Sequence, residues 1–170
     1  MLDRVSGSRI KWDPPLGSLK LKVDGSYLNG VMRGGGILRD SWCLVIVGFR
    51  DFYGPRSSLC AEVCVILSGV MVCRRRDLTV AKIELDSEVL VREIQCSHEL
   101  PWDMIYMICR WTMETDQGQR IHHNGRESNF EADSSARMGR LNEDHVIYDS
   151  LGSLPIECKA IINGDARRLR

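Results

Sequence analysis

The chain has 170 residues, of which 44% are hydrophobic and 27% charged, a composition typical of a folded globular protein. Its 23 basic and 23 acidic residues balance, which excludes a surface that is basic throughout and leaves only a local basic patch for binding nucleic acid. No apolar run reaches the roughly 20 residues that a membrane-spanning helix needs. The seven cysteines show no paired spacing and no apolar leader opens the chain, so we expect reduced thiols in an intracellular protein that contacts no membrane.

The first half of the chain predicts three strands followed by a long helix. Residues 1–18 are polar and contain prolines, and we interpret them as a flexible leader. Alternating apolar and polar residues predict a half-buried strand over residues 19–24, ended by Gly25. Residues 34–49 predict a hairpin. Residues 57–76 predict a helix, because apolar side chains recur there at helical spacing and form one stripe: Leu59, Val63, Ile66, Leu67 and Val70.

The second half predicts two more strands and three helices. In chain order they are a strand over 80–86, a helix over 87–95, a helix over 101–114, a strand over 120–123 and a helix over 129–140. The last helix begins with a capping box, in which Ser128 and Glu131 each satisfy a free backbone amide of the other.

This order of elements predicts a mixed sheet covered by helices. We expect one domain over residues 19–140, preceded by the leader. Residues 141–170 show no firm pattern, and we leave them as an unassigned C-terminal tail.

Two aspartates follow predicted strands at the point where each strand ends. Asp24 ends the first strand, and Asp86 ends the strand over residues 80–86. If these two strands are parallel neighbours, the carboxylates meet at one edge of the sheet, where ligand sites of α/β proteins form. The alternative is that each aspartate only caps a turn.

Two further carboxylates lie on predicted helices. Glu62 flanks the apolar stripe of the long helix, where a carboxylate needs an ionic partner, a metal or a raised pKa. A neighbouring arginine is the alternative partner. Asp133 lies near the start of the last helix, where the helix dipole alone would favour an acidic residue.

The basic run Arg74-Arg75-Arg76 ends the long helix. Pairing with the helix dipole explains it, and contact with a phosphate backbone is the alternative.

Five segments in this order resemble the ribonuclease H domain of plant non-LTR retroelements. They are Val23-Asp24-Gly25-Ser26, Gly35-Gly36-Ile37-Leu38-Arg39-Asp40, Ala61-Glu62, Glu84-Leu85-Asp86-Ser87 and Arg126-Glu127-Ser128-Asn129-Phe130-Glu131-Ala132-Asp133. The run Trp12-Asp13-Pro14-Pro15 resembles the lead-in of the same family, so the resemblance covers residues 12–140.

The resemblance implies an α/β fold of the ribonuclease H type. Its five-stranded mixed sheet combines an antiparallel meander with two strands parallel to the first, and helices cover both faces. The family binds two Mg²⁺ ions, with Mn²⁺ as an alternative, through four carboxylates that fall here on Asp24, Glu62, Asp86 and Asp133. Oxygen ligands of this kind suit hard divalent cations.

The implied reaction is hydrolysis of the RNA strand of an RNA–DNA hybrid by a monomeric endonuclease derived from a retroelement. The resemblance places His123 where the family has a histidine that assists product departure, although a histidine at a strand end can instead bind backbone. Five polar or small residues are candidates for contact with the hybrid: Gly25, Ser26, Asn29, Ser87 and Asn129.

The sequence departs from the family at two places near the predicted site. Lys22 replaces an asparagine before the first Val-Asp pair, and Asn124-Gly125 replaces an apolar segment after the histidine. Two alternatives therefore remain open: a catalytically silent module of the same fold that binds nucleic acid, and a retroelement fragment that folds poorly.

Overall fold

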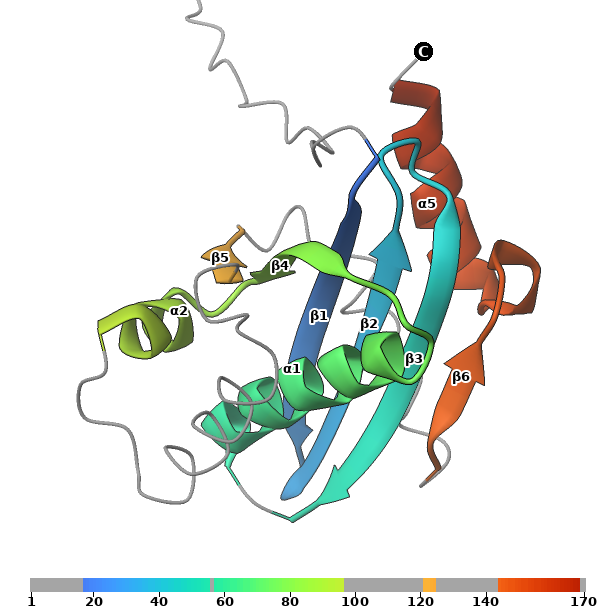
Figure 1. The fold of residues 1–170 in the computed structure, drawn as a ribbon. Coiled ribbons are helices and arrows are strands. Elements are labelled where there is room, and N and C mark those ends of the chain that lie inside the picture. Colours follow the sequence, from blue (N-terminus) through green and yellow to red (C-terminus); the bar gives the residue numbers. More distant parts are fainter. Residues whose placement is uncertain (1–16, 56, 97–120, 125–143, 169–170) are drawn as a thin grey trace, which may run out of the picture.

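Six strands form one mixed sheet in the computed structural model, which describes residues 17–55, 57–96, 121–124 and 144–168 (Figure 1). The order across the sheet is β5–β4–β1–β2–β3–β6. The central strands are antiparallel neighbours, whereas β4 is parallel to β1 and β5 is parallel to β4. The strands are β1 (Leu19–Leu28), β2 (Val31–Arg39), β3 (Val45–Gly54), β4 (Val80–Leu85), β5 (Ile121–His123) and β6 (Val146–Tyr148).

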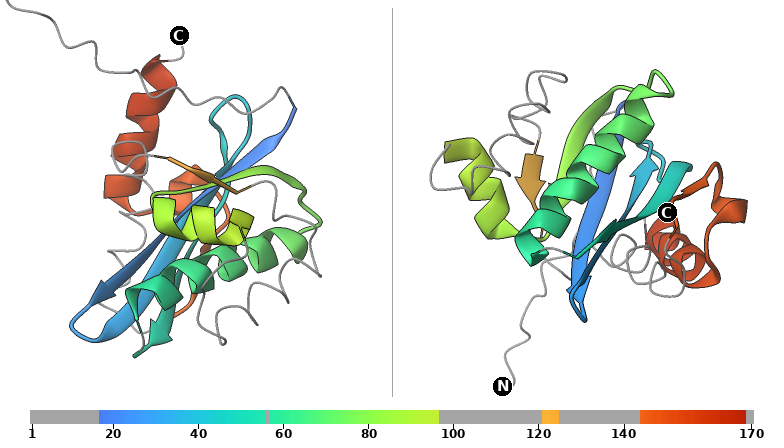
Figure 2. Two further views of the ribbon diagram at one scale, coloured as in Figure 1. Left: turned by 90° about the vertical axis from the view of Figure 1, so that its left-hand side faces the viewer. Right: turned by 90° about the horizontal axis from the view of Figure 1, so that it is seen from below.

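Helices lie on both faces of this sheet. They are α1 (Ser58–Arg74), α2 (Glu88–Cys96), α5 (Ile156–Arg168) and the short 3₁₀ helix η3 (Leu151–Ser153). The views in Figure 2 place α1 on one face and α5 on the other. Among the described helices, none has the length and hydrophobicity to cross a bilayer.

The predicted meander and the two parallel strands are confirmed, but the prediction of five strands is wrong. A sixth strand, β6, pairs antiparallel with β3 through Val146, Ile147 and Tyr148. It lies in the segment left unassigned, together with α5, because three residues are too few to show an alternating pattern. The predicted helices over 101–114 and 129–140, with the capping box, lie outside the described residues.

The first strand also runs further than predicted. β1 continues through Gly25 and Ser26 to Leu28, and a two-residue turn then leads into β2. Asn29 and Gly30 form this turn, both with positive φ, at 54° and 78°. Asn-Gly is the preferred pair for such hairpin turns because asparagine and glycine tolerate left-handed backbone. The predicted end at Gly25 is therefore wrong, and the Asn-Gly pair was the better signal.

Helix α1 packs closely on the sheet. It begins after Ser57, whose hydroxyl accepts a hydrogen bond from the Cys60 amide, as expected for an N-cap. Gly69 makes the approach possible, because a methyl group there would lie 2.7 Å from the side chain of Leu21 on β1. The main apolar core lies between this helix and the sheet, and a smaller core under α5 contains Ile37, Tyr148, Leu154, Cys158 and Ile162.

Candidate metal centre

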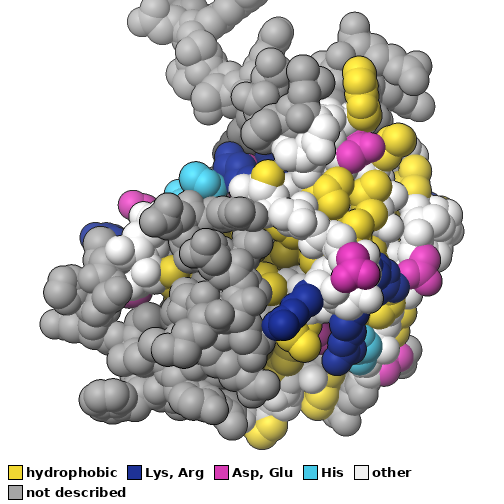
Figure 3. Space-filling view, viewed as in Figure 1, with side chains coloured by type: hydrophobic (Ala, Val, Ile, Leu, Met, Phe, Trp, Pro, Cys, Tyr) yellow, Lys and Arg dark blue, Asp and Glu magenta, His cyan; other side chains and the backbone are white. Residues whose placement is uncertain are grey.

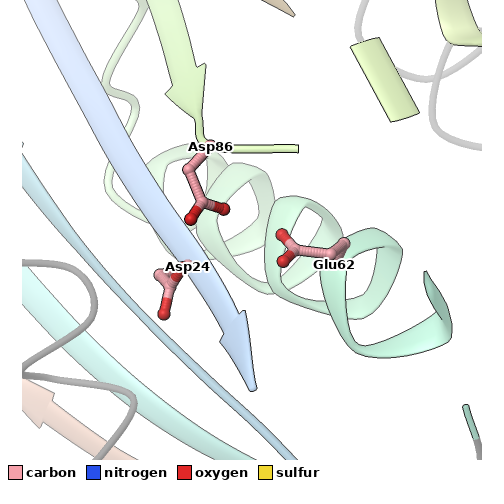
Figure 4. A group of neighbouring side chains, drawn as sticks. All are labelled: Asp24, Glu62 and Asp86. Atoms are coloured by element: carbon pink, nitrogen blue, oxygen red, sulfur yellow. The ribbon is translucent and has the colours of Figure 1, made fainter. Parts of the chain in front are cut away.

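Three of the four predicted carboxylates meet at one edge of β1. Asp24 comes from β1, Glu62 from the first turns of α1, and Asp86 from the residue after β4. One oxygen from each carboxylate lies within 4.8 Å of the others, and Figure 4 shows Glu62 and Asp86 reaching toward β1 at Asp24. The expected convergence is thus observed for these three, while Asp133 lies outside the described residues.

The carboxylates can meet because β4 stops pairing with β1 before Asp24. β1 and β4 pair in parallel up to Lys22, which lies opposite Glu84, and the pairing stops there. Asp24 follows two residues later, where β1 no longer has β4 beside it. Asp24 is only 6% exposed to solvent. The carboxylate of Asp86, just past the end of β4, can therefore approach it.

Gly25 brings Glu62 to the same place. A methyl group on Gly25 would lie 2.6 Å from the carbonyl carbon of Ala61 and 2.6 Å from the amide nitrogen of Glu62. The backbone of α1 therefore rests directly on β1 beside Asp24, an approach that any side chain at Gly25 would prevent. This contact explains why Asp24 is followed by glycine. The predicted contact of Gly25 with substrate stays a prediction.

Asp86 is held between a strand and a helix. Ser87 follows it and accepts a hydrogen bond from the Leu90 amide at 3.4 Å, so the serine caps the start of α2. The short linkage leaves Asp86 little freedom to move away from the end of β4. This cap is the structural role of Ser87, and its contact with substrate stays a prediction.

A buried charge cluster lies on the sheet face opposite α1. The carboxylate of Glu84 on β4 accepts from the ammonium of Lys20 at 3.0 Å and lies 2.9 Å from that of Lys82. Lys20 is 1% exposed and Glu84 is 3% exposed. Burial would raise the pKa of Glu84, but the two lysines outweigh it and lower the pKa to about 2. Burial lowers the pKa of Lys20, and Glu84 opposes that shift.

Asn124 joins this cluster to the end of β5. Its side-chain amide donates to the second oxygen of Glu84 at 2.8 Å, and its backbone amide donates to the Leu85 carbonyl at 2.8 Å. Asn124 replaces an apolar family residue, and the structure shows what it binds. Glu84 therefore connects β1, β4 and β5, the strands that carry or adjoin Asp24, Asp86 and His123.

The remaining predicted site residues have different surroundings. His123 is exposed on β5, opposite Leu85, the residue before Asp86. Ser26 is half-buried on β1, and Asn29 is exposed in the turn. Asn129 lies outside the described residues. Burial and the nearby Lys82 lower the pKa of His122, the neighbour of His123.

The residue types fit a divalent metal. Three carboxylates in close contact repel one another, and a cation relieves that repulsion. All three offer oxygen ligands, which Mg²⁺ and Mn²⁺ prefer. Within the described residues, this is the group that brings three such ligands together.

The fold is similar to that of solved ribonucleases H. LC11 RNase H1, solved with an RNA/DNA hybrid, is 17% identical with a TM-score of 0.61, covering 71% of this chain and 95% of that one. RNase H1 of Halobacterium salinarum is 19% identical with a TM-score of 0.62, covering 75% and 100%. The N-terminal RNase H domain of a Mycobacterium tuberculosis protein is 18% identical with a TM-score of 0.63, covering 71% and 91%. The chain thus carries a domain of the ribonuclease H-like fold.

The sequence identifies the family. It matches the family described as reverse transcriptase-like over residues 22–139, more than half of its length, and the chain belongs to that family. A protein of Arabidopsis thaliana named "Putative ribonuclease H protein" is 30% identical over 135 residues, which are 75% of this chain and 21% of that protein. The chain therefore spans about a fifth of that relative. These matches confirm the resemblance inferred from the motifs.

Sequence reasoning missed Glu84, Lys20 and Asn124 as parts of the site. The alternating pattern put Glu84 on the same face as Lys82, but a single sequence does not show that this face is buried. The signal available was the charge pattern itself: basic residues at positions 20, 22 and 82 share a face with one glutamate once β1 and β4 are paired.

Proposed function

We propose that this chain is a two-metal-dependent endonuclease that hydrolyses the RNA strand of RNA–DNA hybrids. The observation that carries the proposal is the convergence of Asp24, Glu62 and Asp86 within 4.8 Å. The ribonuclease H-like fold and the name of the plant relative support it. In this proposal Asp133 supplies the fourth carboxylate, and the protein acts as a monomer.

The carboxylates hold and orient the cations. When bound, two divalent cations stabilise the charge that develops on the entering and leaving oxygens and lower the pKa of the attacking water. Asp24 is fixed by the sheet and Glu62 by the contact of α1 with Gly25, so both are in place before substrate arrives. Asp86 completes the set from the end of β4.

The other predicted residues act on the nucleic acid. In this proposal His123, which is exposed on β5 opposite the residue that precedes Asp86, delivers a proton as the product leaves. Ser26 follows the site on β1 and Asn29 lies in the turn beyond it, and in this proposal both meet the 2′-hydroxyls that distinguish RNA from DNA. Ser87 and Asn129 complete the proposed set.

The experiment is cleavage of a labelled RNA–DNA hybrid in Mg²⁺ and in Mn²⁺. The native chain should cut only the RNA strand and only with metal. Asp24→Asn and Asp86→Asn should each lower the rate at least about 10³-fold, because each removes a charged metal ligand. The exposed carboxylate of Glu157 on α5 gives a matched control, and Glu157→Gln should cut normally.

A catalytically silent binding module is the second candidate, favoured by the departures from the family at Lys22 and Asn124. It would bind the hybrid without metal, with an affinity that falls steeply as salt rises, and cut nothing. Absence of cleavage under either metal, together with such binding, would replace the enzyme by this module.

A further inference from the structure

A cavity with a mixed polar and apolar lining lies between the C-terminal half of α1, β3 and the residue before β6. Its volume is about 360 Å³. Figure 3 shows basic and histidine side chains beside exposed hydrophobic atoms where α1 approaches β3 and β6. The lining residues are Asp51, Leu67, Ser68, Met71, Val72, Arg75 and His145. None of them belongs to the carboxylate group around Asp24.

Hydrogen bonds orient the polar side chains of this cavity. The Nδ1 atom of His145 contacts a carboxylate oxygen of the buried Asp51, which leaves Nε2 for another partner. The Tyr53 hydroxyl donates to the Ser68 oxygen at 3.0 Å, and the other Asp51 oxygen lies 3.5 Å from the same hydroxyl. Burial, reinforced by Asp51, raises the pKa of Tyr53 far above its usual value, so this hydroxyl stays a donor. Because Ser68 accepts from Tyr53, its own proton is directed elsewhere.

Arg75 differs from the arginines around it. Arg50 forms an ion pair with Asp144 at 3.0 Å, and Arg76 forms one with Asp149 at 2.6 Å. For Arg75, which is exposed and lines the cavity, the described part of the chain provides no carboxylate partner. Its guanidinium can therefore take an anion from solution. This separates Arg75 from its neighbours in the basic run Arg74-Arg75-Arg76.

The side chains that line the cavity determine which class of ligand it can bind. Arg75 and Ser68 offer donors, and His145 offers a nitrogen that can donate or accept, while one oxygen of Asp51 is bound by His145. Asp51 and His145 are too few to bind a metal, for which three or four protein ligands are usual. An arginine fork with a hydroxyl and an imidazole suits a tetrahedral anion. The apolar side chains among the lining residues, Leu67, Met71 and Val72, suit a compact apolar body.

We propose that this cavity binds a small phosphate-bearing molecule: Arg75, Ser68 and His145 hold the phosphate, and the apolar body rests on α1. The site is separate from the carboxylate group and its occupation does not depend on nuclease activity. A structural role for the Asp51–His145 contact, in fastening the start of β6 to β3, is compatible with this binding but does not by itself predict it.

The test is calorimetric titration of the full chain with phenyl phosphate, inorganic phosphate and phenol. Phenyl phosphate should bind saturably and more tightly than inorganic phosphate, and phenol should not bind. Arg75→Gln and Ser68→Ala should each weaken phenyl phosphate binding about tenfold or more. Arg92→Gln, which changes an exposed arginine on α2, should leave it unchanged.

Two outcomes would overturn the proposal. One is no saturable binding of either phosphate by the native chain up to about 10 mM. The other is equal binding by the native chain, Arg75→Gln and Ser68→Ala, with thermal unfolding showing that all are folded. Asp24→Asn should bind phenyl phosphate like the native chain, so the outcome is independent of the nuclease proposal.

Discussion

The two faces of the sheet differ in what they bury. The face under α1 is apolar, with Leu21 and Val23 of β1 beside Ile83 and Leu85 of β4. The opposite face of the same two strands buries charged side chains: Lys20, Lys22, Asp24 and Glu84. Apolar burial stabilises a fold without direction, whereas a buried ion pair adds little net stability but requires exact partners. The comparison suggests that one face holds the domain together and the other sets the positions of the carboxylates.

The largest effect is expected when the buried pair of Lys20 and Glu84 is broken. One variant removes Glu84 alone, and a second variant removes both members of the pair. Glu84→Leu alone leaves the buried ammonium of Lys20 without this ionic partner and should lower the free energy of unfolding by about 3–5 kcal/mol. The double variant Glu84→Leu with Lys20→Met removes the buried pair and leaves only the partly exposed Lys82 and the Asn124 amide without their acceptor, so it should recover most of that loss. Denaturant unfolding measures both. A double variant as unstable as the single one would mean that the charged face also holds the fold together.

Lowering the pH should weaken the same buried cluster. The pKa of Glu84 is about 2 in the folded chain against an ordinary 4.5, so its contribution is fully present above pH 4.5 and is lost as the pH falls toward 2. The shift corresponds to about 3 kcal/mol. The free energy of unfolding, measured from pH 6 to pH 2, should therefore fall more steeply for the native chain than for the double variant. Parallel curves would contradict the lowered pKa.

A variant at Gly25 tests whether the close contact of β1 with α1 positions Glu62. Gly25→Ala places a methyl group against the α1 backbone and should cost about 1–3 kcal/mol of stability, because neither β1 nor the helix can yield easily. It should also displace Glu62 and lower hybrid cleavage. Gly30→Ala is an instructive contrast, since nothing lies within 4 Å of its added methyl group and only its positive φ opposes the change. Normal stability and cleavage in Gly25→Ala would exclude this contact as the device that positions Glu62.

The smallest effect is expected at Asn124. Asn124→Leu restores the apolar character of the family and removes one hydrogen bond to Glu84, which should cost about 1 kcal/mol of stability. Cleavage should fall a few-fold if this bond fixes the end of β5 beside Asp86. Glu157→Gln, a change of an exposed side chain on α5, is the control. A faster or unchanged rate in Asn124→Leu would show that the hydrogen bond does not position His123.

Much of this arrangement was predictable from local pattern. The apolar stripe of α1 and the strand ends at Asp24 and Asp86 follow from periodicity, and motif resemblance joined them with Glu62. Burial of Lys20 and Glu84 was not predicted, because the residues of one strand do not show that its polar side is covered, and their matching charges become visible only once β1 and β4 are paired. The pair of Asp51 and His145 was missed for a related reason: 94 residues separate them, and β6 is too short to reveal its pairing. Asp133 and Asn129 remain predictions.

The central claim is that Asp24, Glu62 and Asp86 form a site for divalent cations, and calorimetric titration of the full chain with Mn²⁺ tests it most directly. The native chain should bind Mn²⁺ saturably, Glu62→Gln should bind it at least about tenfold more weakly, and Glu157→Gln should match the native chain. Equal Mn²⁺ binding by the native chain and Glu62→Gln, or none by the folded native chain, would contradict the account.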